Sequence, residues 1–123
     1  MSVQNNQPDP NLPTIEFTND FQTVLRGPSS MGQGKLQIVY DSSRLAVPAT
    51  YGGFITYVRW NNDSSVFRKS IPGYSYYGSN AVLLFDMPDG SDTTVSIWFE
   101  SIDKGGNIIG YDSNYGNNYV ISL

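Results

Sequence analysis

The sequence TTVSIWFE (residues 93–100) alternates apolar and polar side chains almost throughout its length. Val95, Ile97 and Phe99 fall on one side of an extended chain, whereas Trp98 shares the other side with polar neighbours. A period of two residues is typical of a β-strand that buries one face. The stretch therefore predicts a strand, and we interpret the rest of the chain outward from it.

Eight further segments show extended patterns, bounded by turn residues. They are residues 14–17, 21–25, 35–41, 54–60, 65–71, 80–87, 108–111 and 119–123. No window shows a helical period, and 12 glycines and 7 prolines interrupt the chain at short intervals. These features predict an all-β fold, an immunoglobulin-like antiparallel β-sandwich of about seven to nine strands in two packed sheets. A closed barrel is the structural alternative.

A chain of 123 residues predicts one domain. Residues 1–13 are polar and contain three prolines, so we expect a flexible N-terminal tail before a single sandwich domain over residues 14–123. No signal peptide is visible, and no apolar run approaches the about 20 residues of a transmembrane helix. The expected location is cytoplasmic, with secretion by another route left open.

The composition excludes several classes of function. A net charge of −4 with only 7 basic residues argues against nucleic acid and anionic membranes as partners. The chain has neither cysteine nor histidine, which excludes disulfides, thiolate metal sites and the common Ser-His-Asp and Cys-His catalytic groups. No spacing singles out a catalytic carboxylate pair, so we expect a protein that is not an enzyme and has no cofactor.

The sequence YDSNYGNNY (residues 111–119) concentrates aromatic rings and planar hydrogen-bonding groups in nine residues. Rings stack on the C–H face of a sugar, while Asn and Asp side chains bind paired hydroxyls. We therefore predict ligand contacts by Asp112, Asn114, Tyr115 and Asn117. The structural alternative is a loop in which Asp112 caps turn amides and Tyr119 packs inward.

Three aromatic residues outside this loop are further candidates for ligand binding. Trp98 lies on the polar side of its strand, and an exposed tryptophan often marks a binding surface. Trp60 adjoins an asparagine-rich turn, although a core tryptophan fits the same position. Tyr76 lies in a stretch of Tyr, Ser, Gly and Asn, residue types that are common in binding loops.

The runs VSIWFESIDKGG (residues 95–106) and YDSNYGNNY (residues 111–119) resemble the C-terminal half of a family of bacterial β-sandwich domains of unassigned function. The segment VYDSSRL (residues 39–45) is similar to an earlier strand end of that family, and Trp60 to the strand that follows. The C-terminal pattern is also similar to the asparagine-rich loop of starch- and glycogen-binding modules. Tyr111 stands where that motif has Trp, and Ser113 where it has Asn. The resemblance implies an immunoglobulin-like sandwich whose loop contacts α-glucan.

These observations predict a non-catalytic carbohydrate-binding protein, a lectin or carbohydrate-binding module, with a glycan or polysaccharide as its partner. Two alternatives stay open. In one, the tyrosine-rich loops form the interface of a homo-oligomer. In the other, oxygen ligands in the acidic turns bind calcium and stabilise the sandwich.

Overall fold

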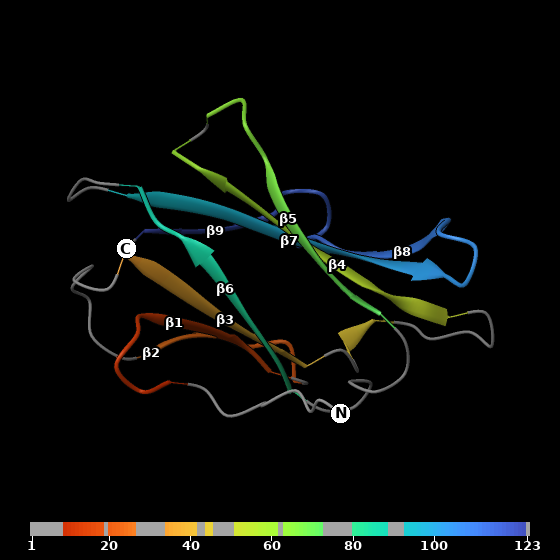
Figure 1. Ribbon diagram of the computed structural model, residues 1–123, viewed down its shortest axis with the longest axis horizontal. Helices are drawn as coiled ribbons and strands as arrows, with labels where there is room; N and C mark the ends of the chain where they lie inside the picture. Colours follow the sequence, from red (N-terminus) through yellow and green to blue (C-terminus); the bar gives the residue numbers. More distant parts are fainter. Residues whose placement is uncertain are drawn as a thin grey trace. The chain divides into compact units, whose positions relative to one another are not determined.

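The computed structural model describes residues 9–18, 20–26, 34–41, 44–45, 51–61, 63–72, 80–88 and 93–122. Nine strands make up its regular structure (Figure 1): β1 (Thr14–Phe17), β2 (Thr23–Arg26), β3 (Lys35–Asp41), β4 (Tyr51–Trp60), β5 (Phe67–Pro72), β6 (Asn80–Asp86), β7 (Thr94–Asp103), β8 (Ile108–Asp112) and β9 (Tyr119–Ser122). The predicted all-β class and strand number are confirmed. Over these residues, no helix has the length and apolar character that crossing a membrane requires.

The strands form two sheets, each within its own compact unit. The first unit contains a four-stranded sheet in the order β2-β1-β3-β6, and the second contains β4, β5, β7, β8 and β9. Every pairing is antiparallel, as predicted, except that β1 runs parallel to β3. The sequence between these two strands is long enough for β2 to intervene, which lets β3 run in the direction of β1.

The first unit buries alternate residues of β6, whereas β3 is buried on both faces from Leu36 to Tyr40. One fully buried position is occupied by Tyr40, whose ring lies 6.0 Å from that of Phe17. The guanidinium of Arg44 lies 5.3 Å from the Phe17 ring centre and 5.0 Å from that of Phe21. Arg44 also donates to the carbonyl of Thr18 at 2.9 Å. The arginine thus fixes the turn between β1 and β2 through both cation–π contacts and a hydrogen bond.

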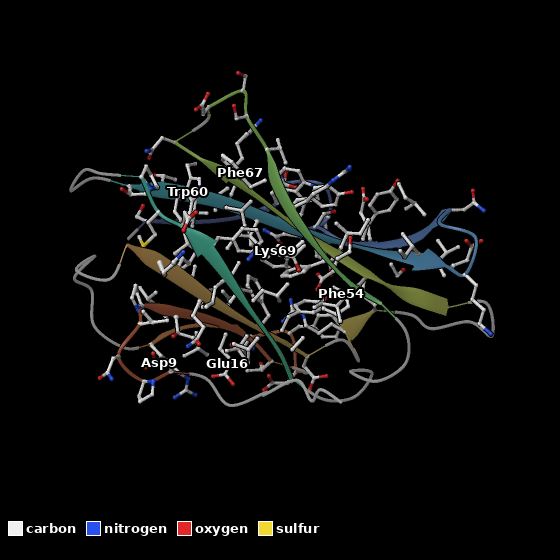
Figure 2. The ribbon with its side chains drawn as sticks, viewed as in Figure 1. Asp9, Glu16, Phe54, Trp60, Phe67 and Lys69 are labelled. Carbon is white, nitrogen blue, oxygen red and sulfur yellow. The ribbon has the colours of Figure 1, made fainter. Side chains whose placement is uncertain are left out.

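Residues 9–13 are fixed to the first sheet, although the sequence predicts that they belong to a flexible tail. The buried Gln37 of β3 accepts a hydrogen bond from the Asp9 amide at 2.9 Å and donates one to its carbonyl at 3.1 Å. Leu12 is buried, and Asp9 lies beside this sheet in Figure 2. A buried amide requires partners for both its donor and its acceptor, and here the backbone of residue 9 supplies them.

The second unit is built around β7, its longest strand together with β4. β4 pairs along one side of β7, while β8 and β9 share the other side, β8 with residues 99–102 and β9 with residues 94–97. Alternate positions are fully buried, among them Phe54, Val58 and Phe99. We call this side of the sheet the Phe54 face and the opposite side the Trp98 face.

A tight turn joins β7 to β8. The Asp103 carboxylate accepts hydrogen bonds from the amides of Gly105 and Asn107 at 2.9 and 2.8 Å. The hydrogen bond from the Asn107 backbone lowers the pKa of Asp103, and those from Gly105 and Gly106 act in the same direction. Gly106 has a φ of 88°, a conformation that glycine adopts without strain. The turn therefore sets the register in which β8 returns along β7.

Candidate ligand-binding face

The Trp98 face collects aromatic and charged side chains from four adjacent strands. Strand pairing places Tyr57 opposite Trp98, Arg68 opposite Tyr57, and Tyr111 opposite Glu100. Directly paired residues of a sheet project to the same side. The face therefore carries these side chains together with Arg59, which follows Tyr57 by two residues on β4.

The rings of Tyr57 and Trp98 form a stacked pair. Their centres are 5.3 Å apart and their planes differ by 6°. Both residues are half-buried, and Tyr111 on the neighbouring strand is 66% exposed. The two rings hold each other in a fixed orientation while leaving apolar surface open to solvent. Such a preformed aromatic surface suits a flat, partly apolar ligand.

Charged groups adjoin the stacked pair at the Tyr57 hydroxyl. Tyr57 donates a hydrogen bond to Oε1 of Glu100 at 2.6 Å, and the Arg68 side chain also hydrogen-bonds to Tyr57. Burial raises the pKa of Tyr57 above its ordinary value, and the hydrogen bond and charge of Glu100 add to the increase, whereas Arg68 lowers it. The phenol therefore stays protonated at neutral pH and joins the carboxylate to the guanidinium.

Trp98 lies beside a gap in the neighbouring strand. On that side of β7, Ile97 pairs with Tyr119 of β9 and Phe99 pairs with Asp112 of β8, so the pairing is interrupted at Trp98. Residues 113–118 leave the sheet edge at this point, as the dark blue loop between β8 and β9 in Figure 1. The loop that the sequence singles out thus begins and ends next to Trp98.

The loop itself is a tight left-handed turn. Asn114, Tyr115 and Gly116 have consecutive positive φ values of 52°, 57° and 87°. The Asn117 amide donates to the Asn114 carbonyl at 3.1 Å, and the Asn114 side chain donates to the Asn118 carbonyl at 3.1 Å. Side chains are disfavoured in this region of φ, except for Asn and Asp, which tolerate it. The turn leaves the Tyr115 side chain fully exposed.

Asp112 and Tyr119 close the base of this loop. The Tyr119 hydroxyl donates to the Asp112 carboxylate, and both residues belong to the Phe54 face. Asp112 is only 7% exposed. The bond connects the end of β8 to the start of β9 across the gap. The predicted sugar contact by Asp112 is therefore replaced by a structural role.

The structure distributes the seven predicted contact residues over different environments. Trp98 lies on the half-exposed face, and Asn114, Tyr115 and Asn117 are exposed in the adjoining loop. Trp60, labelled in Figure 2, is 6% exposed. It lies an even number of residues from Phe54 on β4, so it projects to the opposite side of the sheet from Trp98. The predicted stacking role of Trp60 is therefore wrong, because its ring is in the core. Tyr76 lies outside the described residues.

Sequence reasoning missed Tyr57, Arg59 and Arg68 as members of the site. The signal for Tyr57 was present, because it alternates with Thr56 and Val58 in a segment that was predicted as a strand. The positions of Arg68 and Trp98 beside it depend on the pairing of strands that are distant in sequence. The register of these pairings is a tertiary property, so no local sequence pattern predicts it.

Within the described residues, no three acidic side chains gather closely enough to hold a metal ion. Comparison of the chain with known protein families, with curated proteins and with solved structures finds no match.

Proposed function

We propose that the chain is a non-catalytic carbohydrate-binding protein whose sugar site is the Trp98 face. The observation that carries this proposal is the stacked, half-exposed pair of Tyr57 and Trp98, with Glu100 and Arg68 hydrogen-bonded to the Tyr57 hydroxyl. A pyranose ring presents apolar C–H groups on its faces and hydroxyls around its rim. The aromatic rings would contact the former, and the carboxylate and guanidinium the latter.

The adjoining loop supports this assignment. It leaves the sheet beside Trp98 and exposes Asn114, Tyr115 and Asn117. Amide groups on a turn next to an aromatic surface can bind a second sugar unit of a chain. The resemblance to starch- and glycogen-binding modules, whose asparagine-rich loop contacts glucan, points in the same direction.

A glycan array followed by calorimetric titration tests the proposal. The array should include neutral glucans such as maltoheptaose, acidic polysaccharides and common monosaccharides. Trp98→Ala should weaken binding to every glycan that the wild type binds by about tenfold or more. The loss of a central aromatic contact typically costs about 2 kcal/mol or more. A change of about 1.4 kcal/mol in binding free energy corresponds to a tenfold change in affinity.

Phe67→Ala is the matched control for this experiment. Phe67 is 54% exposed and pairs with Val58, so its ring lies on the Phe54 face of the same sheet. The variant therefore removes an exposed ring from the face opposite the proposed site. Its affinity should equal that of the wild type. Absence of binding to every glycan at millimolar concentration, by a protein that melts cooperatively, would refute the function. Equal losses in both variants would refute the location of the site.

A further inference from the structure

Two arginines flank the aromatic pair on the Trp98 face. Arg68 lies opposite Tyr57 on β5, and Arg59 lies two residues further along β4, about 7 Å from Tyr57. Among the described strand residues of this face, Glu100 is the one acidic side chain. The whole chain has a net charge of −4, so this excess of positive charge is local.

The two arginines differ in what they contact. Arg68 and Glu100 both hydrogen-bond to the Tyr57 hydroxyl, so the charge of Arg68 is partly balanced within the face. Arg59 lies opposite Ser96, and its Nε atom is buried with no hydrogen-bond partner among the described residues. A buried donor of a charged group without an acceptor is uncommon in folded proteins. Its burial leaves the two Nη atoms as the part of the guanidinium that a ligand can reach.

Arg59 is close to the stacked rings. It pairs with Ser96, which precedes Trp98 by two residues on β7, so Arg59 is the diagonal cross-strand neighbour of Trp98. A ligand lying on the rings would therefore place its edge near the guanidinium. The two Nη atoms of a guanidinium present parallel N–H donors that match the two oxygens of a carboxylate.

We propose that the Trp98 face selects sugars that carry a carboxylate, and that Arg59 binds this carboxylate while Tyr57 and Trp98 contact the sugar ring. This inference rests on the proposed carbohydrate site and specifies its substrate class, a uronate-containing polysaccharide. The carboxylate would accept hydrogen bonds from the two Nη atoms of Arg59, because Nε is covered by the protein itself. The C–H face of the same sugar unit would cover the exposed surface of the rings.

The test compares an oligoglucuronate with its carboxyl-reduced form, a neutral glucan of the same linkage and length. Titration calorimetry of the full chain at low salt should give an affinity for the acidic oligomer about tenfold or more above that for the neutral one. Raising the salt concentration should weaken the acidic ligand selectively, because the ion pair is only partly buried. The neutral oligomer should show little dependence on salt.

Arg59→Gln assigns the preference to one side chain. This variant should bind the two oligomers about equally, so that the ratio of the acidic to the neutral affinity falls by about tenfold to near one. Arg59→Lys keeps the charge but loses the paired donors, so it should retain only part of the preference. Lys104→Gln removes a positive charge from the exposed turn after β7 and should leave both affinities unchanged. Thermal melting of each variant verifies that the fold is intact.

The outcomes separate this inference from the proposed function. Equal affinity of the wild type for both oligomers, or an acidic preference that survives in Arg59→Gln, would overturn the inference and leave the carbohydrate site standing. If neither oligomer and no glycan of the array binds, both the inference and the proposed function are overturned. An acidic preference that disappears in Arg59→Gln supports both.

Discussion

Tyr115 occupies a backbone conformation that is unfavourable for a residue with a large side chain. Its φ is 57°, it stands between two other residues of positive φ, and its ring is fully exposed. Strain of this kind persists only where surrounding contacts impose it, and it is concentrated at functional positions. The hydrogen bonds from Asn117 to Asn114 and from Asn118 to Ser113 impose it here.

Replacing Tyr115 by glycine should therefore stabilise the protein. Relief of the left-handed conformation is worth about 1–2 kcal/mol per residue, which exceeds the about 0.4–1 kcal/mol that glycine costs by adding entropy to the unfolded chain. The exposed ring buries no surface that would be lost. Asn117→Gly, at a loop position without a positive φ, should instead destabilise by about 0.5–1 kcal/mol. Urea unfolding of the two variants measures the difference. A lower stability for Tyr115→Gly would show that the ring is held by contacts.

The Tyr57 hydroxyl should ionise at a higher pH than an exposed tyrosine. Burial and Glu100 raise its pKa, so the folded state favours the protonated phenol. The resulting stabilisation is fully present below the ordinary pKa of tyrosine and is lost as the pH rises through the higher folded-state value. Absorbance at 295 nm should show a late-titrating component, part of which Tyr57→Phe removes. A titration curve unchanged by Tyr57→Phe would contradict the assignment.

The contact between β7 and β8 contains a close approach that depends on glycine. A Cβ atom at Gly110 would lie 2.7 Å from Oγ of Ser101, which is buried without a hydrogen-bond partner among the described residues. Gly110→Ala should destabilise by about 1–3 kcal/mol through overpacking. Ser101→Ala should be neutral or stabilising, because it removes an unsatisfied buried hydroxyl.

The double variant Ser101→Ala/Gly110→Ala provides the decisive measurement for this pair. Once the hydroxyl is absent, the alanine at residue 110 has room, so the two changes should be strongly non-additive. Equilibrium unfolding of the four proteins gives the coupling free energy. Additive effects would show that the β8 backbone, and not the Ser101 hydroxyl, limits the space at residue 110.

The strands were predictable where local alternation is strong. The bounds of β1 and β3 match the sequence prediction to the residue. β2 begins two residues later than predicted because Phe21 adopts a φ of 62° in the preceding turn. β7 continues past the predicted end at Glu100 to Asp103, since pairing with β4 and β8 extends the strand through a mixed sequence. Tertiary pairing here overrides a weak local signal.

The candidate site was predictable only in part, for the same reason. The alternation of residues 93–100 is sufficient to place Trp98 on the polar side of its strand. The turn residues around Tyr115 and Asn117 are sufficient to predict that these two side chains are exposed. The assembly of Trp98 with Tyr57 and Arg59 depends on the antiparallel register of β4 and β7. Aromatic residues in a strand can face either side of a sheet, and only the register and burial decide which, as Trp60 illustrates.

At the scale of the whole molecule, the edges of the sheets determine whether copies associate. β5 ends the sheet order of the second unit and exposes Phe67, but the next two residues are Arg68 and Lys69. Positive side chains on an edge strand oppose pairing with a second copy. We therefore expect a monomer of 13.6 kDa by light scattering. A dimer would favour the alternative of a homo-oligomeric assembly protein.

Lys69→Val tests whether charge protects this edge. The variant extends the apolar surface beside Phe67 and should shift the mass toward dimers and larger species as concentration rises. Lys104→Val removes the same charge from an exposed turn and should remain monomeric. Equal behaviour of the two variants would show that the edge is blocked by other means.

The gap beside Trp98 has a consequence for how new specificities can arise. Because β8 and β9 pair separately with β7, neither register depends on the residues between them. The bond between Tyr119 and Asp112 holds the two ends together whatever lies between. Segments of other lengths could therefore be grafted between these two residues without disturbing the sheet. The loop sequence can therefore change while the aromatic surface stays the same. The variable loops of an antibody change on a constant framework in the same way.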